Sequence, residues 1–127
     1  MLEPKDFLAF AQRLVAEPAQ DASSDNKQVN QRTSINRAYY ATFHIIKRYL
    51  VIHCKKEAPG EAVHSWLIRE LRSKHSGRMG LINKLEQMRG DRERADYDLN
   101  WGDYALSTAV QTTLTSAKTL ISEWGRN

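Results

Sequence analysis

The sequence predicts an all-α fold: an up-and-down bundle of four helices, the third of them broken, in one domain over residues 1–127. Apolar residues recur every three or four positions along four long stretches, which is the spacing of an amphipathic helix. Breaks rich in proline, glycine and polar residues separate these stretches, and no alternating strand pattern of useful length occurs. A chain of 127 residues is enough for one hydrophobic core and not for two. Helices joined by short connections pack as antiparallel neighbours, which favours the up-and-down arrangement.

The first helix is expected over residues 4–17. Pro4 suits a first helical turn, where its missing N–H has no partner to lose, and Pro18 stops the helix. Residues 20–26 are polar and rich in turn and capping side chains, so they are expected to form a loop. The second helix should begin near the end of that loop, with Asp25 or Asn26 as its N-cap.

The second helix is expected to be the longest. Its apolar positions run from Ile35 through Tyr39, Ile46 and Leu50 to His53, and other apolar residues between them widen the stripe. A helix with so broad an apolar face is expected to lie at the centre of the bundle, or to form a subunit interface as well.

The third helical segment is expected in two parts. A break at residues 58–60 is followed by a helix over residues 61–72. Residues 73–80 contain two glycines and form a second, softer break, after which the helical pattern returns from Leu81 toward Arg94. The third segment is therefore predicted to be two shorter helices in series.

The last helix is expected from Asp103 to Trp124. Asn100, Trp101 and Gly102 end the preceding segment, and Asp103 is a suitable N-cap for the new helix. Gly125 is a suitable C-terminal stop.

The composition is that of a soluble globular protein, with 41% apolar and 27% charged residues. Its net charge of +4 and pI near 9.3 are compatible with phosphate ligands without requiring them. Cys54 is the single cysteine, which excludes an intramolecular disulfide and fits a reducing cytosol. No apolar run approaches the roughly 20 residues of a membrane span, and the first residues hold no secretion signal, so a cytoplasmic protein is expected.

Two polar stripes are expected to meet between helices. Arg37, Tyr40 and His44 lie at i, i+3 and i+7 of the second helix, so they share one of its faces. On the third segment, Arg89, Arg92 and Asp96 lie at i, i+3 and i+7, and Arg92 with Asp96 is an i, i+4 pair. If the stripes face each other, the carboxylate orients an arginine beside an aromatic ring and an imidazole.

Such a cluster is suited to a phosphate. A guanidinium binds phosphate through two parallel N–H bonds, and a carboxylate behind it holds it in place. Tyr40 and Tyr97 could stack on a base. The alternative is a structural network in which Asp96 and Arg37 or Arg92 satisfy each other between helices, and the spacing alone does not choose between the two.

The same segments resemble the HEPN family of small four-helix proteins. Its second helix often reads S-x-x-R-x-Y-Y-A-x-F, as residues 34–43 do here, and its third closes with Arg-x-x-Ala-Asp-Tyr, as residues 92–97 do. The resemblance covers most of the chain. It implies a homodimer that associates with RNA or a nucleotide, of the prokaryotic toxin–antitoxin or phage-defence type.

The resemblance also implies a chemistry. HEPN ribonucleases cleave RNA without a metal: the 2′-hydroxyl attacks the adjacent phosphate, a histidine acts as acid or base, and an arginine stabilises charge. Their histidine follows the arginine by a few positions, and Arg92 has no such histidine here. His44 on the facing helix is the candidate to act with Arg92, and His64 is expected to line the same cleft.

The resemblance implies protein partners too. These are a minimal nucleotidyltransferase antitoxin, which can modify a tyrosine such as Tyr97, or a larger defence complex. Two other interpretations stay open, a non-catalytic helical interaction module and a nucleotide-sensing subunit. The sequence has no zinc-binding helix, Walker-type loop, dinucleotide fingerprint or nucleophile elbow, so neither a metal nor a cofactor is expected.

Overall fold

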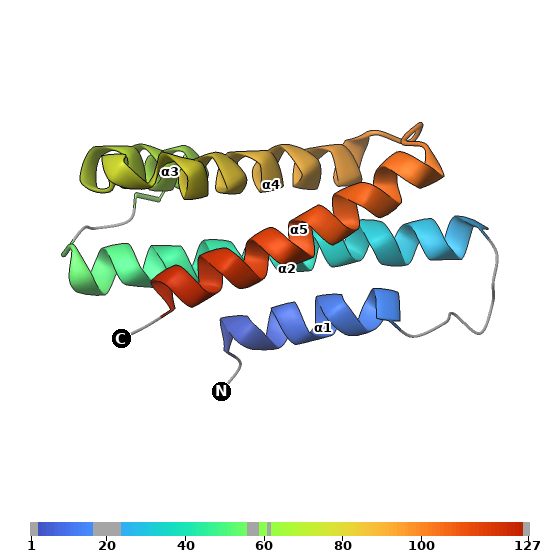
Figure 1. Cartoon of the computed structure of the whole chain (residues 1–127), viewed down its shortest axis with the longest axis horizontal. Helices are drawn as coiled ribbons and strands as arrows, with labels where there is room; N and C mark the ends of the chain where they lie inside the picture. Colours follow the sequence, from blue (N-terminus) through green and yellow to red (C-terminus); the bar gives the residue numbers. More distant parts are fainter. Residues whose placement is uncertain (1–2, 17–23, 56–58, 61, 126–127) are drawn as a thin grey trace.

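The protein is all-α, as predicted. The computed structural model describes residues 3–16, 24–55, 59–60 and 62–125, and within them it contains five packed α-helices, one short 3₁₀ helix and no strand (Figure 1). The helices are α1 Pro4–Ala16, α2 Ser24–His53, α3 Val63–Lys74, η1 Ser76–Arg78, α4 Met79–Tyr97 and α5 Asp103–Trp124.

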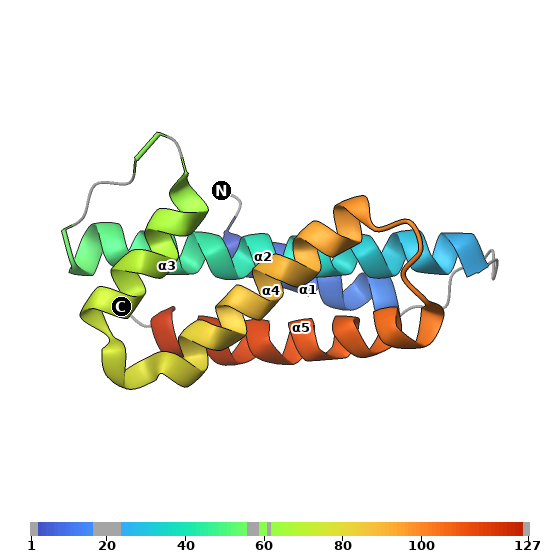
Figure 2. The same ribbon diagram turned by 90° about the horizontal axis from the view of Figure 1, so that it is seen from above.

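α2 lies at the centre of the fold. It packs against α1, α3, α4 and α5, and both ribbon views show α1 and α5 running along it (Figures 1 and 2). Tyr39 is 1% exposed, Phe43 4%, and Ile46 and Leu50 0%. The broad apolar face of this helix is therefore buried within one chain, and at Tyr39 and Phe43 it offers no surface for a second subunit.

The starts of two helices differ slightly from the predicted ones. α2 begins at Ser24, so residues 24–26, expected to be loop, form its first turn, where the carboxylate of Asp25 faces the positive end of the helix. α5 begins at Asp103, but its N-cap is Gly102. The rest of the predicted loop, the last residue predicted for the first helix and the predicted start at position 61 lie outside the described residues.

The third helical segment is broken, as predicted. α3 continues to Lys74 and α4 begins at Met79, so the break is confined to η1 and its neighbours. The N–H of His75 bonds to the carbonyl of Leu71 at 2.8 Å, and the N–H of Arg78 bonds to the carbonyl of His75 at 2.8 Å. Because hydrogen bonding continues across the turn, the break is shorter than predicted. In Figure 2, α3 and α4 leave this turn in different directions.

The turn between α4 and α5 is tied to the first half of α2. Gln28 donates a hydrogen bond to the carbonyl of Trp101 at 3.1 Å. Arg32 donates one to the carbonyl of Ala95 at 3.0 Å, which satisfies a carbonyl near the end of α4. Trp101 is 3% exposed, and the guanidinium of Arg94 lies 4.4 Å from its ring centroid. We call Gln28, Arg32, Arg94 and Trp101 the turn anchor.

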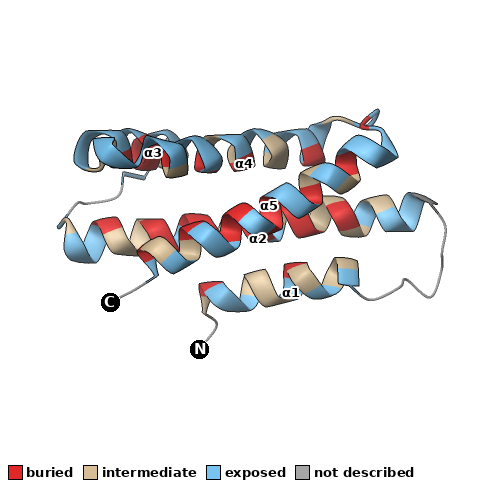
Figure 3. Cartoon of the chain, in the orientation of Figure 1, coloured by how far each residue is buried: buried red, intermediate tan, exposed pale blue. Residues whose placement is uncertain are grey.

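Figure 3 shows exposed residues along α3 and α4 and buried residues recurring along α2 and α5.

α4 reaches Tyr97, beyond its predicted end at Arg94. In the described part of the chain, no helix is apolar over a length that could cross a membrane.

Candidate functional site

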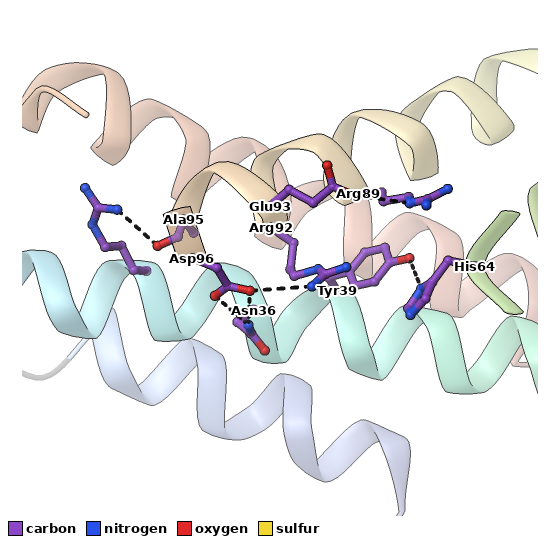
Figure 4. Close-up of polar contacts among 9 residues, drawn as sticks. Asn36, Tyr39, His64, Arg89, Arg92, Glu93, Ala95 and Asp96 are labelled. Carbon is purple, nitrogen blue, oxygen red and sulfur yellow. Dashed lines mark hydrogen bonds and ion pairs between the residues drawn. The ribbon is translucent and has the colours of Figure 1, made fainter. Parts of the chain in front are cut away.

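Polar and aromatic side chains from three helices meet where α3 and α4 cover α2 (Figure 4). Their spacing brings them together, because residues three or four apart share one face of a helix. We call this group the arginine cluster, and its members are Tyr39, Tyr40 and His44 of α2, His64 of α3, and Arg89 and Arg92 of α4.

Arg92 lies against two aromatic rings. Its guanidinium carbon is 5.5 Å from the ring centroid of Tyr39 and 5.9 Å from that of Tyr40, within the range of cation–π contacts. Its Nη1 is 3.5 Å from Oδ2 of Asp96, and its side chain is 16% exposed. The Nε of Arg92 is buried without a hydrogen-bond partner among the described residues. Within the described residues, Arg92 thus forms one long hydrogen bond, to Asp96, and its partly exposed side chain has further donors for a ligand that approaches it.

Arg89 is also incompletely paired. Its Nη1 donates a hydrogen bond to Oγ of Ser65 at 3.3 Å, and its Nε is 3.6 Å from Oε1 of Glu93. That Nε is buried and, in the part of the chain that is described, has no hydrogen-bond partner. The carboxylates beside the arginines are more exposed than the arginines: 53% for Glu93 against 31% for Arg89, and 33% for Asp96 against 16% for Arg92. Solvent therefore screens the negative charges more than the positive ones.

Tyr39 and His64 form a short hydrogen bond, with 2.6 Å between the Tyr39 hydroxyl and Nδ1 of His64. Burial raises the pKa of Tyr39 to about 12, although the charges of Arg89 and Arg92 oppose this shift. The phenol is therefore protonated at neutral pH. In the tautomer in which it donates to Nδ1, the ring proton of a neutral His64 lies on Nε2.

His64 is neutral at physiological pH. Burial lowers its pKa below the usual 6.5, and the charges of Arg92 and Arg89 lower it further, while Glu93 acts in the opposite direction with a smaller effect. The electrostatic potential at His64 is thus positive. In the tautomer with the ring proton on Nε2, the Nε2–H is a hydrogen-bond donor.

His44 extends the row of rings to α1. Its ring stacks with Tyr40, with 6.2 Å between centroids, and with Phe7, at 6.4 Å. Partial desolvation by the neighbouring rings lowers the pKa of His44, and the charges of Lys47 and Arg48 lower it further. The exposed His44 ring is therefore neutral at neutral pH and can accept a proton.

Most of the predicted site residues come together. The predicted catalytic pair, Arg92 and His44, meets at one ring, since both contact Tyr40. His64 joins them through Tyr39, and Asp96 is the carboxylate next to Arg92.

Arg37 and Tyr97 lie apart from this group. The exposed Arg37 lines a groove of about 310 Å³ together with Asp96, but the cross-helix hydrogen bond to Asp96 comes from Asn36, at 3.0 Å. Arg37 is about 100° further around the helix than Asn36. Tyr97 ends α4 and is 80% exposed. It follows Asp96, the residue that bonds to α2, so its side chain points in another direction around the helix.

Two side chains of this region are absent from the predicted site. Asn36 lies four residues before Tyr40 and eight before His44, so the spacing could have revealed it. The sequence places Tyr39 in the apolar stripe of the second helix, which its 1% exposure supports. A buried tyrosine also needs a partner for its hydroxyl, and that requirement was the missed signal.

The cluster has the chemistry of an anion-binding site. Among the described residues, no three His, Cys, Asp or Glu side chains are placed to hold a metal ion. Comparison with protein-family models, curated proteins and solved structures gives no match to this chain. The fold and the cluster define its class: an all-α protein in which Arg92 lies against two tyrosine rings, with a second partly paired arginine and two neutral imidazoles in the same cluster.

Proposed function

We propose that the arginine cluster binds a phosphate of RNA or of a nucleotide. The observation that carries this proposal is the state of Arg92, which is 16% exposed, lies against two rings and has a buried Nε without a partner in the described residues. A phosphate would accept two parallel bonds from this guanidinium. Tyr40 and His44 offer ring faces on which a base can stack.

Metal-independent cleavage of RNA is the activity that the cluster supports best. Neutral His44 would take the proton of a 2′-hydroxyl, whose oxygen attacks the adjacent phosphorus. The bond from phosphorus to the 5′ oxygen breaks, that oxygen takes a proton from water, and a 2′,3′-cyclic phosphate remains. Arg92 and the Nε2–H of His64 would stabilise the charge that develops on the phosphate.

A HEPN-like four-segment bundle is part of this proposal, with α3 and α4 together as the third segment. The positions of residues in the two motif segments, 34–43 and 92–97, support this bundle. The hydroxyl of Ser34 donates to the carbonyl of Ala11 at 2.8 Å and ties α2 to α1, while Ala41 is 0% exposed. Tyr39, Tyr40 and Arg92 belong to the cluster. The corresponding role is that of a toxin or phage-defence protein, with a nucleotidyltransferase antitoxin or a larger complex as partner.

The activity is tested by incubating the purified protein with a mixed RNA pool, in EDTA and in Mg²⁺. We expect equal cleavage in both and products that end in a cyclic phosphate. Arg13→Gln is a suitable control, because it removes an exposed arginine of α1 outside the cluster. RNA that binds without being cleaved would show that the catalytic part is wrong, and a protein that neither binds nor cleaves RNA or nucleotides would refute the whole proposal.

A second proposal concerns protein interaction. Tyr97, Leu99 and Tyr104 flank the turn between α4 and α5 and are 80%, 85% and 86% exposed. Large apolar side chains so close in sequence and so exposed are typical of an interaction surface. We propose that the expected homodimer forms here and not through α2. Sedimentation should then give a dimer for the wild type and a monomer for Leu99→Glu, whereas a dimer that survives this change would exclude the surface.

A further inference from the structure

A hollow lies on the other side of His44 from Tyr40. It has a volume of about 440 Å³ and lies between the start of α1 and the second half of α2. Its apolar lining is supplied by Pro4, Phe7, Val51 and Ile52. The exposed fractions of Val51 and Ile52, 42% and 56%, are large for apolar side chains.

The rim of this hollow is positively charged. Arg48 is paired with Glu3 at 3.1 Å, so its charge is largely balanced. Lys47 also lines the hollow and forms no ion pair within the described residues. The hollow therefore combines an apolar, partly aromatic floor with one unbalanced cation, which suits a flat apolar group attached to an anion.

A row of rings joins the hollow to the arginine cluster. Phe7 and His44 are stacked with an interplanar angle of 27°, and His44 and Tyr40 with one of 26°. The far end of the row is Tyr40, and the guanidinium carbon of Arg92 lies 5.9 Å from its ring centroid. Rings in series beside cations are typical of sites that bind single-stranded nucleic acid, where bases stack and the backbone follows the charges.

We propose that this hollow binds one base of a single-stranded RNA whose neighbouring phosphate is held by the arginine cluster. The inference rests on the proposed function and narrows it from RNA or a nucleotide to an extended RNA strand. The base stacks on Phe7 and His44, and Lys47 contacts the next phosphate. A mononucleotide fills only one of the two subsites and binds weakly.

Fluorescence anisotropy with a labelled RNA of about eight nucleotides tests whether the hollow binds a base. This length is chosen because sites for single-stranded nucleic acid span roughly 4–16 nucleotides. The RNA carries 2′-O-methyl groups, which block cleavage through the 2′ oxygen. A second RNA lacks one central base. The proteins are the wild type, Phe7→Leu, Lys47→Gln and Arg92→Gln, with Arg13→Gln as control. Uridine monophosphate serves as a competitor.

For the wild type, we expect removal of the base to weaken binding roughly tenfold, because stacking contributes about 1–3 kcal/mol per base. Phe7→Leu should bind the complete RNA more weakly than the wild type does, and base removal should have a smaller effect on it, since only His44 is left to stack on the base. Lys47→Gln should weaken binding of both RNAs and reduce its salt dependence. Uridine monophosphate should compete only at far higher concentration than RNA.

Three results would overturn the inference: no effect of base removal, an undiminished effect in Phe7→Leu, or competition by the mononucleotide as effective as by RNA. Should Phe7→Leu fail to fold in a circular dichroism melt, Lys47→Gln decides in its place, and unchanged RNA affinity would then count against the hollow. If Arg92→Gln binds RNA as well as the wild type, the proposed function fails. This outcome does not depend on the results for the Phe7 and Lys47 variants.

Discussion

Two arginines of α4 lie over aromatic rings, and they differ in how they are paired. Arg94 lies over Trp101, and its Nε donates to Oδ2 of Asp98 at 2.8 Å. Arg92 lies over Tyr39, is 3.5 Å from Asp96 and has an Nε without a partner among the described residues. Each arginine faces a carboxylate four residues ahead, so the local sequence patterns are alike.

The difference lies in the surroundings. The side chain of Arg94 is 50% exposed, and its ring belongs to the adjoining turn, so water and Asp98 satisfy its donors. The side chain of Arg92 is 16% exposed, and its rings belong to another helix. A partly buried cation with an unsatisfied donor is unfavourable unless something supplies an acceptor. The contact at Arg94 is therefore structural, and that at Arg92 is suited to a ligand.

The largest expected effect is on folding, at the turn anchor. Trp101→Ala should lower the free energy of unfolding by about 3–5 kcal/mol, since a large buried side chain is lost. Urea denaturation followed by circular dichroism measures this. Val29→Ala, at a 59% exposed residue of α2, is the control and should change stability by no more than about 0.5 kcal/mol. Equal effects of the two changes would show that Trp101 does not anchor the turn.

The next largest effect is on RNA cleavage. Arg92→Gln and His44→Gln should each lower the rate by roughly 10²-fold or more, because one removes charge stabilisation and the other the general base. The double variant should be little slower than either single one, as expected for residues that act together. Rates come from single-turnover cleavage of a labelled RNA. Undiminished cleavage in either single variant would place the active site elsewhere.

A smaller effect is expected at Gln28, whose amide donates to the carbonyl of Trp101. Gln28 also donates to Oδ1 of Asp103 at 2.6 Å and accepts from Nη2 of Arg32 at 3.2 Å, so Gln28→Ala should lower the free energy of unfolding by about 1–2 kcal/mol. RNA affinity should stay the same, because no charge changes and the arginine cluster is untouched. Urea denaturation and anisotropy on the same preparation measure both, and a loss of affinity without a loss of stability would reverse the roles assigned to the two regions.

The smallest effect is a pH dependence of stability. Burial lowers the pKa of His64 in the folded protein, so the unfolded chain takes up this proton at higher pH, near 6.5. Stability should therefore fall as the pH drops below about 6.5 and continue to fall until the folded pKa is passed. Urea midpoints at a series of pH values measure it. His64→Gln keeps an acceptor for the Tyr39 hydroxyl and should show a weaker decrease, although His44 and His75, whose pKa values are also lowered, still titrate. An equally steep decrease in His64→Gln would exclude this assignment.

Much of the fold could be predicted from the sequence, because helical periodicity and glycine or proline breaks are local signals. The central position of α2 followed from its broad apolar stripe. The first turn of α2 and the end of α4 could not be placed by the same signals. Ser24 and Asp25 suit a cap and a first turn equally well, and residues after Arg94 remain helical through contacts with α2.

The site was only partly predictable, because spacing gives the face of a helix but not its partner. Tyr40, His44, Arg92 and Asp96 follow from spacing. Arg37 and Asn36 are adjacent in sequence, and only the rotation of α2 against α4 decides that Asn36 makes the bond to Asp96.

The most direct measurement compares Arg92→Gln with Arg94→Gln, which remove the same charge from the two arginine contacts on α4. Both variants are titrated with the 2′-O-methyl RNA at one salt concentration and unfolded in urea. Arg92→Gln should weaken RNA binding on the order of tenfold, since a hydrogen bond to a charged group is lost, and leave the urea midpoint close to that of the wild type. Arg94→Gln should lower the urea midpoint and bind RNA nearly as well as the wild type. Equal losses of affinity in the two variants, or none in Arg92→Gln, would contradict the assignment of a ligand site to Arg92.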